Sequence, residues 1–593
     1  MEKETIKMEN VNIKINGLAV SAPAGSTILD AARLAGIRIP TLCFMKEINE
    51  IGACRMCVVE VKGARSLVTA CVYPVNEGME VFTNTPRVIE SRKKTMQLLL
   101  SNHNRSCLSC VRSGACEFQT MAVELGIEDE GYYDGDKTPS VIDDSAVHMY
   151  RDNSKCILCR RCTAVCEATQ GIACIGANHR GFKTDIGSPF EMPLADTTCI
   201  HCGQCIAVCP TGALSERDDT AKVIAALNDP SKTVVVQTAP SVRAGLGEEF
   251  GYPIGTNVDG KMVAALRRIG FDQVFNTDWG ADLTIMEEAN ELIERVTKGG
   301  VLPMFTSCSP GWVKFCENYF PDLTEHLSSC KSPAQMQGAM IKSYWAQKKG
   351  IDPKDIVMVD VMPCTAKKFE CTRDDQDANG VPDVDISITT RELAKLIKGF
   401  AIDFTILPDE KFDDPFGIGS GAGTIFGATG GVMEAALRTA VETITGAELP
   451  KLEFDDVRGT KGIKTASYEV GGMTVKVCVA SGLSNAREVM EKVRNGEMND
   501  YQFIEIMACP GGCVNGGGQP RQPGYVRDTV DIRALRAKVL YDMDNSESLR
   551  KSHDNPCIKA VYDEYLGKPG GEKAHHLLHT SYVKREINNY TSD

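Results

Sequence analysis

CILCRRCTAVC, at residues 156–166, is repeated as CIHCGQCIAVCP at residues 199–210. In both runs, two, two and three residues separate the successive cysteines. Four thiolates on so short a segment suit soft metals, whereas scattered buried thiols would show no regular spacing. The repeat therefore predicts a small domain that is built around two metal centres.

This spacing, with proline after the last cysteine, is that of bacterial ferredoxins, in which each run contributes its fourth cysteine to the other 4Fe-4S cluster. We therefore predict two 4Fe-4S clusters with crossed ligation. The first is assigned to Cys156, Cys159, Cys162 and Cys209, and the second to Cys199, Cys202, Cys205 and Cys166. Cys174 falls outside the pattern, and we expect it to be an inert core thiol.

Four more cysteines, separated by ten, two and thirteen residues, lie upstream: Cys43, Cys54, Cys57 and Cys71. Residues 10–85 mix short β-rich stretches with one helical segment, STILDAARLAG, in which Ser26 is the expected N-cap. This mixture suits a small β-grasp domain. Four thiolates can hold a 2Fe-2S cluster, and the wide spacing resembles the version in hydrogenases and respiratory complex I. A structural zinc site is the alternative.

A predicted helix over residues 86–103 leads into a third group of metal-binding side chains. One imidazole and three thiolates follow within a short segment, at His103, Cys107, Cys110 and Cys116. Imidazole can replace thiolate on iron, so the segment predicts a further 4Fe-4S cluster, with zinc bound by three cysteines and one histidine as the alternative. Four clusters in the N-terminal third leave little room for a substrate pocket, so this part is predicted to carry electrons.

The composition indicates what class of protein carries these motifs. A chain of 593 residues with 43% hydrophobic content predicts several domains. Its 25 cysteines, together with a polar start that lacks the apolar stretch of a signal peptide, indicate a cytoplasmic metalloprotein, because a reducing cytosol disfavours disulfides. No apolar run is long enough to span a membrane, and a net charge of -14 argues against nucleic-acid binding.

From about residue 223, apolar strands alternate with amphipathic helices, which predicts a large α/β domain with buried parallel strands. Three cysteine loops follow predicted strands in this region: TSCSPGW at 306–312, MPCTAKKFE at 362–370 and MACPGGCVNGGGQP at 507–520. Open α/β sheets place their sites at the carboxyl ends of their strands. We therefore expect the functional site at these loops.

These loops resemble the three signature motifs of FeFe-hydrogenases, and the segments TAPSVR, ADLTIMEEA and GATGGVMEAALR extend the likeness over nearly the whole chain from Cys43 onward. The resemblance implies an iron-sulfur oxidoreductase that interconverts hydrogen with protons and electrons at an H-cluster. That cofactor is a 4Fe-4S cubane joined through one cysteine to a diiron unit with carbonyl, cyanide and a bridging dithiolate. Carried over, the cubane ligands are Cys364, Cys509 and Cys513, and Cys513 is the bridge.

The first loop departs from the family pattern, in which two cysteines are adjacent, the first relaying protons and the second ligating the cubane. Cys308 and Ser309 occupy these positions here. Either Ser309 ligates iron through its hydroxyl, a harder donor than thiolate, or Cys308 takes over as ligand and the relay changes. We expect a working H-cluster whose potential Ser309 alters, and loss of activity is the alternative.

The resemblance also assigns roles around the cofactor. The positions that match the family's proton relay are Cys308, Glu288, Ser328, Glu291 and Glu370. Lys367 matches the residue that pairs with a cyanide ligand, and further pocket positions are matched by Pro240, Ser241, Met362 and Met507. Glu288 and Glu291 lie three residues apart on a predicted helix and share a face, which without the resemblance indicates an ordinary solvated face.

Several other features carry no predicted function. The run GIGSGAGTIFGATGG at 417–431 lacks the ending of a nucleotide-binding loop, so we expect close packing there. No nicotinamide or flavin motif is visible. The cysteines without cluster-like partners are expected to pack in the core: Cys316, Cys330, Cys371, Cys478 and Cys557.

The sequence thus predicts a multidomain fold of α+β and α/β class. Its expected parts are a β-grasp 2Fe-2S domain at 1–87, a His/Cys3 4Fe-4S segment at 88–132, a two-cluster ferredoxin domain at 133–222, a large α/β H-cluster domain at 223–540 and a C-terminal helical wrap at 541–593. The expected cofactors are one 2Fe-2S cluster, three accessory 4Fe-4S clusters and the H-cluster.

The long series of clusters and the missing nucleotide motif favour a subunit of a larger hetero-oligomer. Besides hydrogen and protons, the expected partners are ferredoxin, NAD(P)H-oxidising flavoprotein subunits, or both. Two alternatives belong to other functional classes. An electron-transfer subunit like that of complex I has no use for the three C-terminal loops, and a hydrogen sensor or iron-sulfur assembly relative has no need of the relay positions Cys308 and Glu288.

Overall fold

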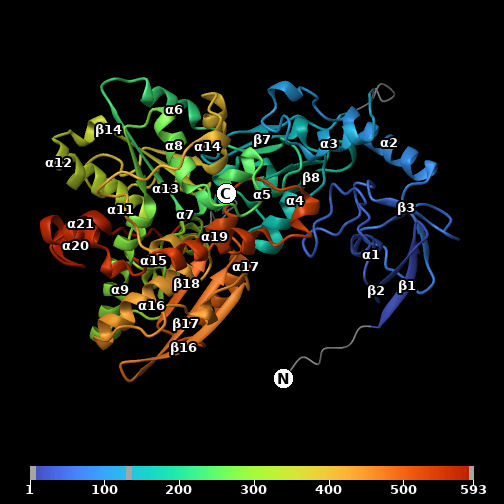
Figure 1. Cartoon of the computed structure of the whole chain (residues 1–593). Coiled ribbons are helices and arrows are strands. Elements are labelled where there is room, and N and C mark those ends of the chain that lie inside the picture. The colour runs from blue at the N-terminus through green and yellow to red at the C-terminus, as the bar shows by residue number, and fades with distance from the viewer. Residues whose placement is uncertain (1–8, 129–136, 586–593) are drawn as a thin grey trace, which may run out of the picture.

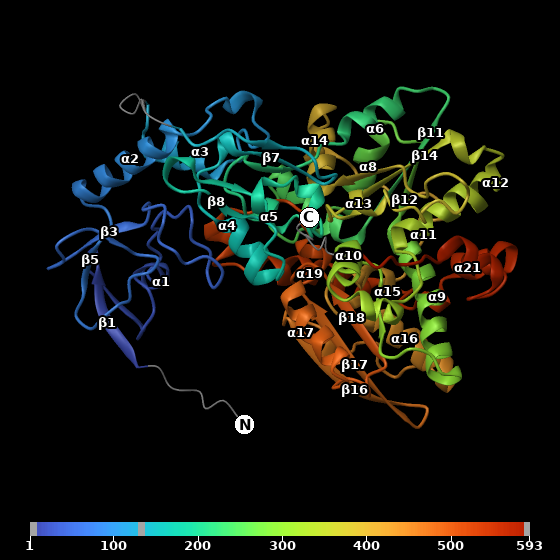
Figure 2. The same cartoon turned by 180° about the vertical axis from the view of Figure 1, so that it is seen from behind.

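The computed structural model describes residues 9–128 and 137–585. Figure 1 and Figure 2 place the N-terminal sheet at one end of the molecule, the cysteine-rich region in the middle, and the C-terminal sheets with their helices at the other end. Within the described residues, every helix is too short or too polar to span a bilayer.

The N-terminal sheet has five strands in the order β2-β1-β5-β3-β4. They are β1 (Asn10–Ile15), β2 (Leu18–Pro23), β3 (Val58–Val61), β4 (Val68–Thr69) and β5 (Glu80–Phe82). Helix α1 (Ile28–Leu34) packs its apolar side on this sheet. The predicted N-cap Ser26 is wrong, because Thr27 and Asp30 form a reciprocal capping box while the Ser26 hydroxyl donates to Pro23.

The predicted helix over 86–103 is confirmed as α2 (Pro86–Ser101). The region around the repeated cysteine runs contains an antiparallel sheet in the order β10-β7-β6 and a separate hairpin of β8 and β9. The strands are β6 (Ile142–Asp143), β7 (Met149–Asp152), β8 (Gly176–Asn178), β9 (Asp185–Gly187) and β10 (Leu214–Glu216). The helices are α3 (Glu117–Glu124), α4 (Arg161–Ala164), α5 (Gln204–Val208) and α6 (Thr220–Leu227).

The two cysteine runs share a backbone conformation as well as a spacing. Leu158 and His201 hold the same position in their runs, with φ of +54° and +59°, and Arg160 and Gly203 follow with +61° and +67°. Left-handed backbone is uncommon for residues other than glycine. Its recurrence at matching positions supports the internal repeat and lets each chain segment turn successive thiols towards one centre.

Two four-stranded sheets form the C-terminal part. The first, ordered β12-β11-β14-β15, is entirely parallel, as predicted, and consists of β11 (Thr233–Thr238), β12 (Gln273–Asn276), β14 (Ile356–Met362) and β15 (Ile386–Thr389). The second, ordered β13-β18-β17-β16, consists of β13 (Met304–Phe305), β16 (Ile463–Val470), β17 (Met473–Ser481) and β18 (Phe503–Met507). Strands β16 and β17 form an antiparallel hairpin that the strand–helix alternation did not predict.

Helix α9 (Thr277–Lys298) lies between the two sheets. Trp279 shares a core with Phe275 of the first sheet, whereas Ile285 shares a core with Phe503 of the second. The other helices around the sheets are α7 (Pro240–Gly245), α8 (Asp259–Ile269), α10 (Pro310–Tyr319), α11 (Pro333–Met340), α12 (Ala346–Lys349), α13 (Lys367–Glu370), α14 (Thr390–Gly399), α15 (Gly421–Thr424), α16 (Gly431–Thr445), α17 (Leu483–Arg494), α18 (Gly524–Arg527), α19 (Ile532–Ser546), α20 (Pro556–Val561) and α21 (Glu572–Leu578).

Three predicted domain boundaries fall inside helices. The boundary at 87/88 lies in α2, the boundary at 222/223 lies in α6, and the boundary at 540/541 lies in α19. The boundary at 132/133 and the end of the predicted wrap, from residue 586, lie outside the described residues. Continuous helices at these points join neighbouring parts of the chain without a loose linker.

The glycine run at 417–431 is closely packed, as predicted. A Cβ on Gly423 would collide with the Asp278 carbonyl, and a Cβ on Gly427 would collide with the Ser241 hydroxyl. The cysteines expected in the core are buried or partly buried: Cys316, Cys330, Cys371, Cys478 and Cys557.

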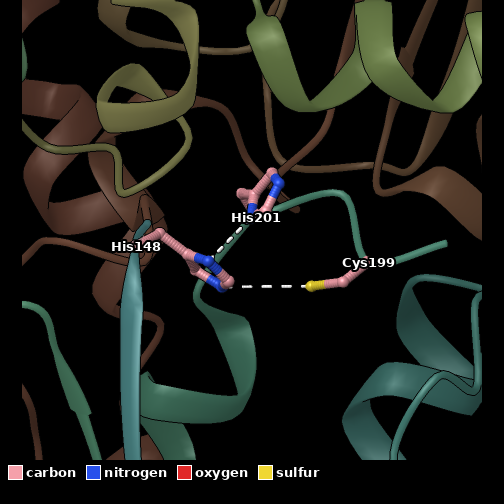
Figure 3. Close-up of side chains that lie close together, drawn as sticks. All are labelled: His148, Cys199 and His201. Carbon is pink, nitrogen blue, oxygen red and sulfur yellow. Dashed lines mark hydrogen bonds between the residues drawn. The ribbon is translucent and has the colours of Figure 1, made fainter. Parts of the chain in front are cut away.

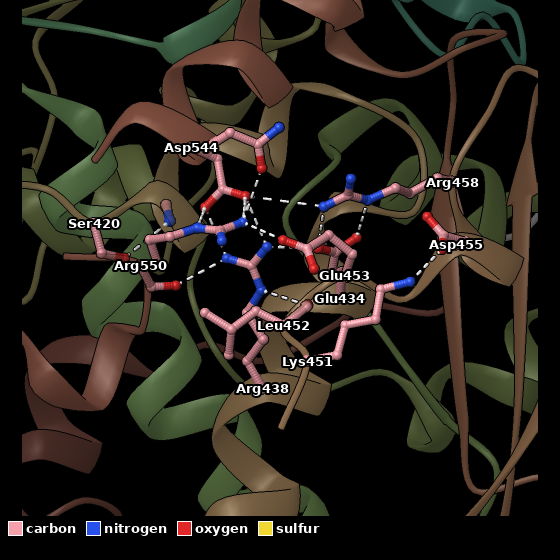
Figure 4. A network of polar contacts seen from close by, with 12 residues as sticks. Ser420, Glu434, Arg438, Lys451, Leu452, Glu453, Asp455, Arg458, Asp544 and Arg550 are labelled. Atoms are coloured by element: carbon pink, nitrogen blue, oxygen red, sulfur yellow. Dashed lines mark hydrogen bonds and ion pairs between the residues drawn. The ribbon is translucent and has the colours of Figure 1, made fainter. Parts of the chain in front are cut away.

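A buried ion cluster joins α16 to α19 (Figure 4). Arg438 is fully buried and donates to the two oxygens of Asp544 over 2.9 and 2.8 Å and to Glu434 over 2.6 Å. Arg458 lies 2.6 Å from Glu434, and Arg550 lies 2.7 Å from Asp544. Although burial alone would raise it, hydrogen bonds from Arg438 and Arg550 hold the pKa of Asp544 below its usual value. The carboxylates are therefore stable only while their arginines are present.

Replacing Arg438 with methionine should destabilise the C-terminal part by about 3–5 kcal/mol, because two buried carboxylates lose their central partner. Lys538→Met, which breaks an exposed pair with Asp542 on α19, should have little effect. Because the native pKa of Asp544 is depressed, the contribution of the cluster is present above its unfolded pKa and is lost as the pH falls through the native value. Calorimetric scans check this, and equal transition temperatures for the two variants would contradict it.

Candidate functional site

The three C-terminal cysteine loops meet at one cavity of about 70 Å³. Cys308 and Ser309 follow β13, Cys364 follows β14, and Cys513 lies in the loop after β18, so strands of both sheets end at the cavity. The lining contains these predicted positions: Pro240, Ser241, Cys308, Ser309, Met362, Cys364, Lys367, Met507 and Cys513. The remaining lining residues had no predicted role, although Ala239, Ala281, Pro363, Phe426 and Gly427 fall within segments quoted above: Ala239, Thr277, Ala281, Pro333, Ala334, Pro363, Phe426 and Gly427.

The cysteines of these loops are crowded, with Cys509 buried and Cys308, Cys364 and Cys513 partly buried. Burial raises the pKa of Cys513 to about 12 and also raises the pKa of Cys364, while Lys367 opposes both shifts. Burial, followed by the neighbouring Cys364 and Cys513, raises the pKa of Cys509 as well. Three thiols that crowd one another away from bulk solvent can ionise together only beside a strong positive charge, which iron supplies. The donor set therefore fits a metal cluster.

Ser309 directly precedes α10, where its side chain makes no capping bond to the helix. Its Oγ accepts a long hydrogen bond, of 3.4 Å, from the Ala508 amide. Both Ser309 and Cys308 line the cavity, so geometry leaves both side chains as candidate fourth donors.

Four of the predicted relay side chains, Cys308, Glu288, Ser328 and Glu291, interact through hydrogen bonds or charge. The Ser328 hydroxyl donates to the Glu291 carboxylate over 2.9 Å. Glu288 is 1% exposed, and burial, followed by the charge of Glu291, raises its pKa to about 8. Glu288 adds to the raised pKa of Cys308, which burial dominates. A solvated helix face is therefore excluded for Glu288, whose Oε2 atom is buried without a hydrogen-bond partner among the described residues.

Glu370, the fifth predicted relay residue, pairs with Lys367. Its carboxylate accepts hydrogen bonds from Lys367 over 2.7 Å and from Ser332 over 3.0 Å. Lys367 also donates to the Ser332 hydroxyl, over 2.6 Å. Glu370 therefore holds the Lys367 ammonium group in place at the edge of the cavity.

The repeated runs gather their thiols in two groups. One small cavity is lined by Cys156, Cys159, Cys162 and Cys209. In the other group, burial followed by the nearby Cys166 and Cys199 raises the pKa of Cys205. Cys174, expected to be a core thiol outside the pattern, is buried with its sulfur 3.7 Å from that of Cys166.

The two upstream ligand groups are also assembled. The Cys57 and Cys71 sulfurs are 3.3 Å apart, and the Cys54 amide donates to the Cys43 sulfur over 3.5 Å. His103 lines a pocket with Cys107, Cys110 and Cys116, and its Nδ1 atom is buried with no partner among the described residues. Burial lowers the pKa of His103 to about 4, which leaves a neutral imidazole that fits metal ligation.

Direct contacts join these groups to the repeated runs. The Asn49 amide donates to the carbonyls of Cys43 and Cys159, over 2.7 and 3.0 Å. The Cys116 thiol donates to the Pro210 carbonyl over 3.5 Å. Both upstream groups therefore adjoin the repeat.

The second run in turn adjoins the cavity loops. The Thr365 hydroxyl donates to the His201 carbonyl over 2.7 Å, and the Gln204 amide donates to the Asn515 carbonyl over 2.8 Å. A Cβ on Gly203 would collide with Thr365, so the two loops are in close contact. Residues 199–204 are thus the part of the cysteine-rich region beside the cavity.

Three buried polar side chains without a predicted role lie at this contact. His148, His201 and Lys314 are hydrogen-bonded to one another beside Cys199. His201 was visible inside the C-I-H-C motif and could have been singled out there. His148 and Lys314 gave no local signal, because they reach His201 only through the fold.

Five protein families match successive parts of the chain. Residues 232–517 match the iron only hydrogenase large subunit, C-terminal domain, and residues 530–585 match the iron hydrogenase small subunit. The N-terminal part matches a 2Fe-2S iron-sulfur cluster binding domain at 8–86, the NADH-ubiquinone oxidoreductase-G iron-sulfur binding region at 92–130 and a 4Fe-4S dicluster domain at 155–213.

Individual relatives cover almost the whole chain. The NADP-reducing hydrogenase subunit HndD of Solidesulfovibrio fructosivorans is 50% identical over 98% of this chain and 100% of that protein. Iron hydrogenase 1 of Clostridium pasteurianum is 45% identical over 96% of this chain and 100% of that protein. A solved FeFe-hydrogenase from Chlamydomonas reinhardtii is 43% identical, with a TM-score of 0.56 over 62% of this chain and 99% of that one. The chain therefore belongs to the FeFe-hydrogenase family.

Proposed function

We propose that this FeFe-hydrogenase is the hydrogen-converting subunit of an NAD(P)-linked complex, with its H-cluster in the cavity between the two C-terminal sheets. One observation carries the proposal: loops from both sheets bring partly buried thiols, Ser309 and Lys367 to a single cavity that adjoins the second cysteine run. Both a place for the cofactor and a route for electrons are therefore present in one chain.

We assign four accessory clusters to the four separate groups of donors. A 2Fe-2S cluster belongs to the N-terminal β-grasp domain, with ligands Cys43, Cys54, Cys57 and Cys71. A 4Fe-4S cluster belongs to the segment with ligands His103, Cys107, Cys110 and Cys116. Two more 4Fe-4S clusters, with crossed ligation, belong to the repeated runs. The contacts through Asn49 and Pro210 support a path from both upstream clusters into the repeat.

The residues around the cavity would position the cofactor and move protons. The bound diiron unit supplies the chemistry that interconverts hydrogen with protons and electrons. Lys367 would donate from its ammonium group to an anionic ligand of that unit, while Glu370 holds the ammonium in place. Protons would pass from Cys308 Sγ to the Glu288 carboxylate, and then through the Ser328 hydroxyl to Glu291.

Ser309 would complete the cubane ligation through its side-chain oxygen. The charge of the buried Glu288 adds to the raised pKa of Cys308, which supports a role for the Cys308 thiol in proton transfer. Ser309 lines the cavity and makes no capping bond that would occupy its oxygen. An alkoxide is a harder donor than thiolate and favours ferric iron, so this ligand would lower the potential of the cubane.

We further propose that the chain works in the cytoplasm with ferredoxin and an NAD(P)H-oxidising flavoprotein subunit. The Solidesulfovibrio fructosivorans relative is named as a subunit of an NADP-reducing hydrogenase. The described glycine run is filled by packing contacts and offers no nucleotide loop, so the nucleotide would bind to a partner subunit. Two upstream clusters would give two points of electron entry.

Cys513→Ala should abolish hydrogen production from a low-potential donor, because the ligand shared by both halves of the H-cluster is lost. Cys478→Ala removes a buried thiol of β17 that has no proposed role, and should retain turnover. Gas chromatography on matured proteins of equal iron content checks both. Turnover in Cys513→Ala would overturn the ligand assignment, and a fully matured wild type without turnover would overturn the proposed function.

Glu288→Gln should lower kcat by about 10²-fold or more, because an amide of the same shape cannot carry the proton. Glu294→Gln, on the exposed side of α9, is the matched control and should be active. Accessory clusters should be reduced equally in both variants, as absorbance measurements during dithionite reduction can show. Wild-type turnover in Glu288→Gln would mean that protons take another route.

Ser309→Cys should raise the midpoint potential of the cubane, since a thiolate favours ferric iron less than an alkoxide does. Ser307→Cys is a suitable control, because the Ser307 hydroxyl donates to the Cys330 carbonyl and is not in the cavity lining. EPR-monitored redox titration measures both potentials. An unchanged cubane potential in Ser309→Cys would exclude Ser309 as a ligand.

A further inference from the structure

A chain of buried polar side chains reaches Cys199, the first cysteine of the second run (Figure 3). The Nε2 atom of His148 lies 3.9 Å from Cys199 Sγ, and the Nδ1 atoms of His148 and His201 are 2.7 Å apart. The Nε2 atom of His201 lies 2.6 Å from Nζ of Lys314. His148, His201 and Lys314 are 1%, 4% and 8% exposed, so little water competes for these contacts.

The lysine at the outer end fixes the direction of the hydrogen bonds. An ammonium group can only donate, so Nε2 of His201 accepts from Lys314. A neutral His201 then carries its proton on Nδ1 and donates it to Nδ1 of His148. His148 in turn carries its proton on Nε2 and donates it to the Cys199 sulfur. Three hydrogen bonds thus point the same way, from an ammonium group to a sulfur.

The surroundings of Lys314 suit a positive charge. Its Nζ atom lies 4.6 Å from the centre of the Phe369 ring, whose face attracts cations. Burial lowers the pKa of Lys314 to about 8, so the ammonium form predominates at pH 7. The hydrogen-bond partner of Lys314 is the imidazole of His201 and not a carboxylate. The ammonium charge therefore polarises the hydrogen bonds of the two imidazoles.

The same side chains do not form a separate metal site. Two nitrogens bound to one zinc ion at about 2.0 Å lie roughly 3.3 Å apart in tetrahedral geometry. The 2.7 Å between the Nδ1 atoms of His148 and His201 is instead a hydrogen-bond length. Cys199 also belongs to the proposed ligands of a 4Fe-4S cluster, so its sulfur is already engaged.

We infer that Lys314, His201 and His148 form a one-way hydrogen-bond chain that donates to Cys199 and raises the reduction potential of the 4Fe-4S cluster of the second run. This inference rests on the ligand assignment in the proposed function. A donor to a ligand sulfur, with a positive charge behind it, stabilises the reduced cluster, which carries one more negative charge. The three residues act through a ligand and are positioning residues.

The location gives this effect a role in electron delivery. The His201 carbonyl accepts from Thr365, and Gln204 donates to Asn515, so the second run adjoins two of the cavity loops. Its cluster would be the last one before the H-cluster. A raised potential at this point would retain an electron beside the catalytic cavity.

Redox titrations at pH 7, monitored by EPR, test this on the full chain with its iron-sulfur clusters. His148→Phe removes the donor to sulfur, and Lys314→Met removes the charge. Each should lower the ratio of reduced to oxidised cluster at a fixed potential, by about tenfold for His148→Phe, which is about 59 mV for a one-electron couple. In the double variant the two shifts should be less than additive, because both residues act through one chain.

His148→Gln can keep an N–H group directed at Cys199 and should restore most of the potential. His179→Phe alters an exposed histidine of the same region and should leave the potential unchanged. Two failures are distinguishable. Missing 4Fe-4S signals in a wild type of full iron content would overturn the ligand assignment. Intact signals with an unchanged potential in both His148→Phe and Lys314→Met would overturn the hydrogen-bond chain.

Discussion

An iron-sulfur cluster needs several sulfur donors at fixed positions around one centre. This requirement explains the backbone conformation and the placement of the cysteine loops. In each repeated run, left-handed residues at matching positions such as Leu158 and His201 arrange three donors locally, and the fourth donor comes from the other run. At the cavity the requirement is met by tertiary structure, because the donors come from strand ends of two separate sheets. Helix α9 packs against both sheets, contributes Thr277 and Ala281 to the cavity lining and carries the buried Glu288, so the packing of two cores sets the geometry of one site.

Hydrogen bonds join the parts of the molecule at their cysteine loops. Asn49 binds the carbonyls of two such loops, and Gln204 binds a carbonyl of the third cavity loop. These side-chain amides replace water at backbone groups that would otherwise be buried without partners. Helices α2, α6 and α19 continue through the predicted domain boundaries. Hydrogen-bonded loops and continuous helices therefore connect the parts of the chain that carry the ligand groups.

Sequence reasoning succeeded where the signal is local. Spacing alone grouped the accessory cysteines, and resemblance identified nine of the cavity-lining residues, from Pro240 to Cys513. It failed where competing local interactions or tertiary contacts determine which partner a side chain has. The capping box of Thr27 displaced Ser26 as N-cap. His148 and Lys314 meet His201 only in the fold, so no window of sequence could reveal their contact.

If the cavity holds an H-cluster, the infrared spectrum of the matured wild-type chain should reveal the carbonyl and cyanide ligands of the diiron unit. Carbonyl and cyanide ligands absorb in a region where ordinary iron-sulfur proteins and polypeptide are transparent. We expect absorption bands from both ligands, and the positions of these bands should shift when hydrogen is added. A protein with its full complement of iron and accessory clusters that lacks these bands would contradict the presence of an H-cluster in the cavity.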